Sequence, residues 1–447
     1  MIPFQVKEFG KIRSLKDHPY FLSTESEIAI PDSTFNSIWD FILSYQEQDA
    51  AIEKAFKIYT KSGKRIIQAQ NYVGIIQTAS GDTIEILPKI FSAEGELTNS
   101  LSKNIFLKML ATVKDSPFIN MQEAAIDTLA DFPIIEVFIS IYLTACEKLL
   151  IFGLKKDYLP KEENSAFIKG KILFSKSISK NLFNKSRTNI LFQAHIEDIP
   201  ENRLIYSTLL KLNEISKSIN NKRRISTLLN FFGSASRSTN YESDFQKTKG
   251  KRNRLFKHYE KLLGWSEVFL LNRNFTNFSG KNINQALLFP MEVIFENFIS
   301  KLFRQYKTSY RMHFQHSEFF LVNRHEERGK FRLKPDIFGK PNSEEVKSIV
   351  IDTKWKVLDQ GKPHKNYFIS QADMYQLYAY GKKYTKGYGE PRLILIYPRN
   401  TNFTEELSSF YYEETDGKYH LELRAIPFDL TGSYFSQLQS ILQESVK

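Results

Sequence analysis

The feature that most constrains this chain is the apolar run Ile-Val-Ile at residues 349–351, followed directly by Asp352, Thr353 and Lys354. An unbroken run of β-branched residues is typical of a strand that is buried on both faces of a sheet. A carboxylate directly after such a strand costs free energy unless a metal ion or a partner group compensates its charge. Because side chains alternate along a strand, Asp352 and Lys354 project to the same face, and a neighbouring strand can bring Asp336 beside them. We therefore expect two carboxylates and an amine at the end of a buried strand.

Two carboxylates and an amine suit the hydrolysis of a phosphodiester. Hard carboxylate oxygens hold Mg²⁺, or Mn²⁺ in its place, and the bound ion polarises the phosphate. An adjacent lysine can orient the attacking water, help to deprotonate it and stabilise the pentavalent transition state. The same residues also fit a surface hairpin in which Asp352 and Lys354 form an ion pair, so other features of the sequence must decide between the two interpretations.

Two expected helices carry further polar groups. The apolar stripe of residues 291–304 predicts a helix with Glu296 at its flank, and Glu292, one turn away, is the alternative carboxylate. In the helix expected at 371–384, Gln376 and Tyr380 lie four residues apart and therefore share a face, where they can contact a phosphate or hold the lysine. The elements complete an α/β pattern with a mixed sheet, whose strands are expected at 318–322, 331–338, 347–354 and 392–397.

The sequence before this α/β pattern divides into two parts. Alternating residues at 72–77 and 83–87 predict a β-hairpin, so residues 1–100 are interpreted as a β-rich N-terminal module. Residues 101–274 show mainly a helical period and contain a basic β insertion. We expect residues 275–447 to form the α/β domain that carries the chemistry.

Charge and cysteine content restrict the class of partner and the compartment. The chain has 62 Lys and Arg against 50 Asp and Glu, a formal charge of +12, which favours a polyanion such as nucleic acid or a membrane surface. Residues 169–187 and 247–257 are strongly basic; each stretch is either a phosphate contact or a solvated loop. A single cysteine, Cys146, excludes an internal disulfide and fits a reducing cytoplasm. We expect neither a signal peptide nor a membrane span, and hence a cytoplasmic protein without a membrane partner.

Three further signals are weaker. His313 and His316 have the spacing of a metal pair but lack a glutamate beside them, so a surface or packing role is favoured. Lys356 lies on the face of Asp352 and is interpreted either as a phosphate contact or as a solvated lysine. No Gly-x-x-x-x-Gly-Lys-Ser/Thr loop occurs in the sequence, so any hydrolysis of a nucleoside triphosphate must belong to another chain.

The chemistry-bearing residues resemble a known superfamily. Glu296, Pro335-Asp336, Asp352-Thr353-Lys354 and the pair Gln376 and Tyr380, in this order, resemble the PD-(D/E)XK nucleases, including the glutamine-tyrosine motif of the RecB-like members. Outside these residues, the segments 72–76, 86–90, 198–203 and 375–380 look like the McrC family, the nuclease subunits of the McrBC 5-methylcytosine restriction system. The similarity to McrC extends over nearly the whole chain.

This resemblance implies an Mg²⁺-dependent DNA endonuclease in a modification-dependent restriction complex with a role in antiviral defence. The implied catalytic residues are Asp336, Asp352, Lys354, Glu296, Gln376 and Tyr380, with the three carboxylates as metal ligands. It also implies an AAA+ GTPase partner, McrB, which recognises the target, drives movement and is contacted and stimulated through residues 1–100. Two alternatives stay open. One is a RecB-like exonuclease or stand-alone restriction endonuclease, and the other is a non-catalytic DNA-binding activator of an NTPase.

Overall fold

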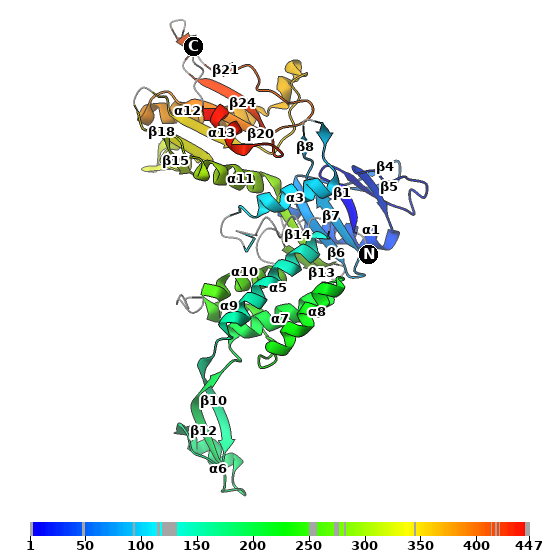
Figure 1. Ribbon diagram of the computed structural model, residues 1–447, viewed down its shortest axis with the longest axis vertical. Coiled ribbons are helices and arrows are strands. Elements are labelled where there is room, and N and C mark those ends of the chain that lie inside the picture. The colour runs from blue at the N-terminus through cyan, green and yellow to red at the C-terminus, as the bar shows by residue number, and fades with distance from the viewer. Residues whose placement is uncertain are drawn as a thin grey trace. The chain divides into compact units, whose positions relative to one another are not determined.

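Both ends of the sequence contribute to one compact unit, with a second unit inserted between them (Figure 1). The computed structural model describes residues 3–46, 50–92, 94–113, 117–118, 132–249, 257–271, 277–280, 283–343, 346–412, 414–415, 418–419 and 421–442. Unit 1 comprises Ile134–Ser279, and unit 2 joins Ile2–Pro133 to Gly280–Lys447. The expected three-part division at residues 100 and 274 stays a prediction.

One sheet joins strands from both segments of unit 2; the full strand order is β1-β7-β6-β14-β13, in which β13 marks the boundary between the two units in the sequence. β6 (Tyr72–Thr78) and β7 (Thr83–Leu87) form the antiparallel hairpin that their alternating residues predicted. β1 (Phe4–Lys7) pairs parallel with β7, and β14 (Ile283–Pro290), which follows β13 (Asn277–Gly280), pairs antiparallel with β6. A Cβ on Gly74 would lie 1.9 Å from the carbonyl oxygen of Leu287, so only glycine allows β14 to approach this closely.

The remaining N-terminal elements include a second sheet and helices, of which α1 and α3 contact the first sheet. A second sheet has the order β3-β2-β5-β4, and α1 contacts β2, β6 and β14. Phe35, Ile38 and Ile42 form the buried stripe of α1, at the spacing of an amphipathic helix. The elements are β2 (Lys11–Ser14), β3 (Glu27–Ile30), α1 (Asp32–Gln46), α2 (Ala50–Ala55), β4 (Phe56–Lys61), β5 (Lys64–Ala69), β8 (Phe91–Ser92), β9 (Gly95–Glu96) and α3 (Asn99–Leu110).

A mixed sheet with flanking helices forms the C-terminal part of unit 2, as expected for an α/β domain. The strand order is β15-β18-β19-β20-β24-β21; β15, β18 and β19 are antiparallel, whereas β19, β20 and β24 are parallel. Every residue of β19 is buried, which confirms the buried strand predicted from residues 349–351. The elements are α11 (Met291–Gln305), β15 (Tyr310–Phe314), β18 (Ile337–Pro341), β19 (Ile349–Thr353), η2 (Pro363–Phe368), α12 (Gln371–Tyr388), β20 (Arg392–Pro398), β21 (Phe410–Tyr411), β22 (Glu414–Thr415), β23 (Lys418–Tyr419), β24 (Glu422–Phe428) and α13 (Tyr434–Leu442).

The strand expected at residues 331–338 is wrong as a single element. β17 (Arg328–Arg332) pairs with β16 (Phe320–His325) in a separate two-stranded sheet, and β18 begins only at Ile337. Phe331 has a φ of +56°, a left-handed conformation that interrupts an extended strand. Pro335 has no N–H group to continue a ladder of hydrogen bonds. The chain therefore leaves the hairpin before Asp336 and enters the mixed sheet after it.

Unit 1 is mainly helical and contains the expected β insertion. α7 contacts α8, α9 and α10, and α5 contacts α8 and α10. The insertion is a sheet of order β10-β12-β11 with α6 beside β12. The elements are α5 (Ile134–Phe152), β10 (Asp157–Ser165), β11 (Lys171–Ile172), α6 (Phe174–Lys180), β12 (Thr188–Ile196), α7 (Pro200–Ile215), α8 (Ile219–Phe231), α9 (Tyr241–Thr248) and α10 (Lys257–Leu271). In the described part of the chain, no helix is both long enough and apolar enough to cross a membrane.

Candidate active site

The carboxyl end of β19 carries Asp352, and Lys354 follows directly after the strand. Asp352 is buried, with 2% of its surface exposed, and Lys354 is half-buried. Oδ2 of Asp352 forms an ion pair with Nζ of Lys354, as the alternation of side chains along the strand predicted. The backbone N–H of Lys354 donates to the carbonyl oxygen of Ile396 at 2.9 Å, which extends the contact with β20 beyond the strand end. Pairing with β20 therefore fixes the position of the Lys354 backbone, from which the amine extends.

Asp336 lies beside Asp352 because β18 and β19 are antiparallel neighbours. Ile337, the first residue of β18, pairs with Ile351, the residue before Asp352. Oδ2 of Asp336 accepts hydrogen bonds from the backbone N–H of Thr353 at 2.7 Å and from its hydroxyl at 2.8 Å. The structure thus brings together the two aspartates that the sequence predicted to be neighbours, and it fixes the orientation of one of them.

Glu296 of α11 joins these aspartates through Gln315. Nε2 of Gln315, which follows β15, donates to Oε1 of Glu296 and also lies 3.4 Å from Oδ1 of Asp336. The backbone N–H of Gln315 donates to the carbonyl oxygen of Asp336 at 2.9 Å. Glu292, the alternative helix carboxylate, instead accepts a hydrogen bond from Asn71 at 3.2 Å. Of the two glutamates, Glu296 is therefore the one beside the aspartates.

Gln376 and Tyr380 of α12 hold the lysine from the other side. Nζ of Lys354 donates to Oε1 of Gln376 at 3.1 Å, and Nε2 of Gln376 donates to the hydroxyl of Tyr380 at 2.7 Å. Four-residue spacing on a helix places both side chains on one face, as expected. All six residues that the sequence singled out thus form one connected set.

Burial and mutual repulsion raise the pKa values of the three carboxyl groups. Burial is the main cause for each; the charge of Asp336 further raises the pKa of Asp352, and the charge of Glu296 further raises that of Asp336. The pKa of Glu296 is raised by burial and by Asp352, although its hydrogen bond from Gln315 opposes the change. Burial alone would lower the pKa of Lys354, but the charge of Asp352, the hydrogen bond to that carboxylate and the charges of Asp373 and Asp336 together outweigh it, so the net change is upward.

The donor groups suit a hard divalent cation. Mg²⁺ prefers carboxylate oxygens and is commonly bound through one or two carboxylates while it keeps several waters. Burial and the neighbouring carboxylates raise the pKa values of Asp336 and Asp352, and a bound cation would favour their charged forms. Among the described residues, no three His, Cys, Asp or Glu side chains lie close enough together to hold a metal ion. The amide of Gln315 lies between Glu296 and Asp336, and the amine of Lys354 lies against Asp352.

Two residues near this site were not identified from the sequence. Gln315 directly follows β15 and has a φ of +52°, a left-handed conformation that the periodicity of a strand does not reveal. Asp373 lies one turn before Gln376 in α12, a spacing that could have shown that they share a face. Its buried carboxylate forms an ion pair with Lys356, with Nζ 2.7 Å from Oδ2. Lys356 is therefore an ion-paired, half-buried lysine rather than a freely solvated one, and its contact with a phosphate stays a prediction.

The two histidines with metal-like spacing pack against aromatic residues. Nδ1 of His316 lies 2.7 Å from the hydroxyl of Tyr384. The rings of His313 and His316 are 6.1 and 5.0 Å from that of Phe338. These contacts agree with the packing role that the sequence favoured.

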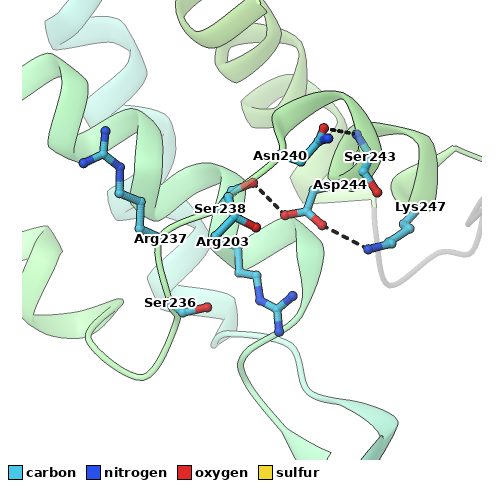
Figure 2. A pocket seen from close by; sticks show the side chains of 9 residues that line it. Arg203, Ser236, Arg237, Ser238, Asn240, Ser243, Asp244 and Lys247 are labelled. Atoms are coloured by element: carbon cyan, nitrogen blue, oxygen red, sulfur yellow. Dashed lines mark hydrogen bonds and ion pairs between the residues drawn. The ribbon is translucent and has the colours of Figure 1, made fainter.

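Acidic neighbours offset part of the charge of both basic stretches. In the first, Nζ of Lys176 lies 2.5 Å from Glu162. The second begins beside a surface pocket of about 240 Å³ in unit 1, where Lys247 lies 3.4 Å from Asp244 (Figure 2). Arg203, which also lines this pocket, forms an ion pair with Asp198 at 2.7 Å. Residues 250–256 of the second stretch lie outside the described residues.

Comparisons with known proteins agree with this architecture. A chain of the refined half-complex from a tetradecameric assembly of Thermococcus gammatolerans McrB AAA+ hexamers with bound McrC matches 98% of this chain and 100% of its own length, with a TM-score of 0.67 and 16% identity. A chain of the cryo-EM structure of the Thermococcus gammatolerans McrBC complex matches 69% of this chain and 89% of its own, with a TM-score of 0.50 and 15% identity. At sequence identities this low, the similarity shows a shared fold and nothing more specific.

Sequence comparison assigns the family. No curated protein matches the chain. The family model of the McrBC 5-methylcytosine restriction system component matches residues 67–398, which is most of the sequence and includes all six residues of the candidate site. The chain therefore belongs to the family of McrBC 5-methylcytosine restriction system components.

Proposed function

We propose that this chain is the Mg²⁺-dependent DNA endonuclease subunit of a GTP-driven, modification-dependent restriction complex, with a PD-(D/E)XK nuclease centre. The convergence of Asp336, Asp352 and Lys354 at the ends of two paired strands carries the proposal. A purely structural hairpin does not require three carboxyl groups with raised pKa values around one amine, two of them buried and the third half-buried. We place the complex in the cytoplasm, where it meets DNA.

In this proposal Asp336 and Asp352 would hold Mg²⁺, or Mn²⁺ in its place, and Glu296 would join them as the third ligand once the amide of Gln315 moves aside. When bound, the ion polarises the scissile phosphate and makes a water nucleophilic at neutral pH. Asp352 keeps the amine of Lys354 charged, so that this amine can orient the attacking water and stabilise charge on the phosphate oxygens. Gln376 and Tyr380 restrict the position of the amine through two consecutive hydrogen bonds.

Two matched pairs of variants test the nuclease assignment. Glu296→Gln should abolish cleavage of DNA, because it removes a charge beside the aspartates, whereas Glu292→Gln on the same helix should leave cleavage unchanged. Asp352→Ala and Lys354→Ala should likewise abolish cleavage without loss of binding to the partner. Full cleavage by Asp352→Ala would refute the assignment. Three other results would favour the alternatives. Processive degradation from DNA ends would favour the RecB-like exonuclease, and cleavage without any partner would favour a stand-alone restriction endonuclease. If the wild-type chain never cleaves DNA but raises the NTP turnover of its partner, the non-catalytic activator would be favoured.

We further propose that the partner is an AAA+ GTPase of the McrB type, which this chain stimulates. The structurally similar chain comes from an assembly described as McrB AAA+ hexamers with bound McrC, and this chain has no phosphate-binding loop of its own. The resemblance to McrC implies that the contact lies in residues 1–100, where Tyr20 and Leu22 are 96% and 86% exposed.

A second surface also fits a protein partner. Large apolar side chains are exposed on the β insertion of unit 1, a feature that marks contact sites on otherwise polar surfaces. They are Tyr158, Phe167, Ile168, Phe174, Ile178, Leu182 and Phe183. Phe183 is 99% exposed and lies among the lysines of residues 169–187.

Rates of GTP turnover distinguish the two surfaces. The double variants Tyr20→Asp/Leu22→Asp and Phe167→Asp/Phe183→Asp each place two charges on one exposed apolar surface. The variant that loses stimulation of the GTPase identifies the contact, and the other serves as its control. Wild-type stimulation by both variants would exclude both surfaces.

A further inference from the structure

A buried hydrogen bond joins the N-terminal part of unit 2 to the residue that follows the site lysine. Trp355 is 4% exposed, and its indole Nε1 donates to the carboxylate of Glu8, at 3.1 Å from Oε1 and 3.0 Å from Oε2. Glu8 is 3% exposed and belongs to the segment after β1, more than 300 residues away in the sequence. A carboxylate is rarely buried to this extent without a role that requires it.

Glu8 is itself held firmly by the β1–β7 sheet. Its backbone N–H donates to the carbonyl oxygen of Leu87 at 2.9 Å, and its Oε1 accepts the backbone N–H of Lys89 at 2.7 Å. Burial raises the pKa of Glu8 to about 7, although the bonds from Lys89 and Trp355 act in the opposite direction. The two groups that donate to this carboxylate therefore come from defined positions, the backbone just after β7 and the residue beside the candidate active site.

Trp355 also contacts the helix that supplies the glutamate of the site. Its ring packs edge-on against Phe295, with 5.4 Å between the ring centroids, and Phe295 is fully buried. Phe295 directly precedes Glu296, just as Trp355 directly follows Lys354. One aromatic contact thus joins the neighbours of two site residues that come from different elements, α11 and the end of β19.

We propose that Trp355 is a positioning residue of the nuclease centre and that Glu8 anchors it, so that the N-terminal sheet sets the spacing between Glu296 and the Asp352–Lys354 pair. The inference rests on the proposed nuclease function. A metal-dependent site needs its groups held within about 0.5 Å of the productive geometry, which is set by the residues that support them. Outer residues of this kind typically change metal affinity or activity by about 10- to 100-fold when they are altered.

Two conservative variants test the proposal on the full chain. Trp355→Phe keeps an aromatic ring against Phe295 but removes the N–H donor, and Glu8→Gln keeps the shape of the acceptor but removes its charge. Trp39→Phe is the matched control, because Trp39 is half-buried and stacks on Phe35 of the same helix, α1. Mn²⁺ binding is measured by titration calorimetry, and Mg²⁺-dependent cleavage is measured with the GTPase partner present.

Both variants should weaken Mn²⁺ binding about tenfold and raise the Mg²⁺ concentration for half-maximal cleavage, with part of the rate restored at high Mg²⁺. The double variant should be no worse than Trp355→Phe alone, because Trp355→Phe removes the hydrogen bond that Glu8→Gln weakens. Both variants should stimulate the GTPase as the wild-type chain does, and the control variant Trp39→Phe should show wild-type Mn²⁺ binding and cleavage. A purely structural role would lower the melting temperature and leave Mn²⁺ binding intact below it, and that result would overturn the proposal.

Asp352→Ala, measured in parallel, distinguishes a failure of this inference from a failure of the proposed function. If Asp352→Ala loses Mn²⁺ binding and cleavage while Trp355→Phe and Glu8→Gln behave as wild type, only the inference is wrong. If Asp352→Ala retains both, the proposed function is wrong and the inference falls with it.

Discussion

Replacing Asp352 by asparagine should stabilise the protein in the absence of metal while it abolishes cleavage. Burial and the charge of Asp336 raise the pKa of the Asp352 carboxyl. A carboxyl group whose pKa is higher in the folded than in the unfolded chain binds more protons when folded. The free energy of unfolding therefore falls as the pH rises from the unfolded pKa, near about 3.9, through the folded pKa. Asparagine has nearly the same shape without the charge, so Asp352→Asn should remove this loss of stability.

The structure sets the size of the effect. The pKa of Asp352 is raised to about 7. Its difference from an ordinary value of about 3.9 corresponds to about 4 kcal/mol, an upper limit because asparagine imitates a protonated carboxyl imperfectly. The repulsion is also shared with Asp336 and Glu296, whose own pKa values would fall on substitution. We therefore expect a gain of about 1–3 kcal/mol at pH 8 and a smaller gain at pH 5, where folded Asp352 is mostly protonated.

Calorimetric unfolding of the full chain in EDTA at pH 5 and pH 8 measures this gain. The control is Asp373→Asn, because Asp373 is also buried and also paired with a lysine, Lys356 at 2.7 Å, but is not one of the three clustered carboxyl groups with raised pKa values. That substitution leaves a lysine without its partner and should lower the stability. The reasoning is refuted if Asp352→Asn is less stable than wild type at pH 8, or if its gain is the same at both pH values.

Four further substitutions or reactions give distinct expected outcomes. Gln315→Leu should lower metal-free stability by about 1–3 kcal/mol in calorimetry, because it removes a hydrogen bond to a carboxylate, and Mg²⁺ should restore part of the loss. Lys354→Met should abolish cleavage but retain Mn²⁺ binding by calorimetry, since the amine is not a metal ligand. The double variant Lys171→Ala/Lys185→Ala should reduce the slope of log DNA affinity against log salt concentration, measured by fluorescence anisotropy. The reduction should be about one for each phosphate contact that is lost. An unchanged slope would mean that DNA binds to another surface. Cys146 is fully buried and burial raises the pKa of its thiol, so it should react with a disulfide reagent only on unfolding, and rapid reaction of the native chain would contradict its burial.

Local patterns in the sequence predicted much of the candidate site. The run at 349–351 gave a buried strand, the alternation of side chains placed Asp352 beside Lys354, and four-residue spacing placed Gln376 and Tyr380 on one face of α12. Each of these inferences depends on residues that are close in the sequence. For such residues the period of a strand or helix determines which side chains meet.

Features that depend on distant residues did not follow from the sequence. β14 joins the N-terminal sheet beside β6, and Glu8 reaches Trp355, through contacts between segments that are more than 200 residues apart. Gln315 and Phe331 adopt left-handed conformations that interrupt the strand pattern at single residues. The periodicity of the sequence does not reveal an interruption of this kind. The amide between Glu296 and Asp336 was missed for this reason.

The most direct test of the metal-dependent nuclease centre is anomalous diffraction at the manganese edge from crystals of the full chain soaked in Mn²⁺. The account predicts a peak between Asp336 and Asp352, at about 2.0–2.3 Å from their oxygens, with Glu296 beside it and the amide of Gln315 displaced. The same soak of Asp352→Ala should show a weaker peak or none. No peak at these aspartates in crystals of the wild-type chain, although Mn²⁺ supports cleavage in solution, would contradict the account.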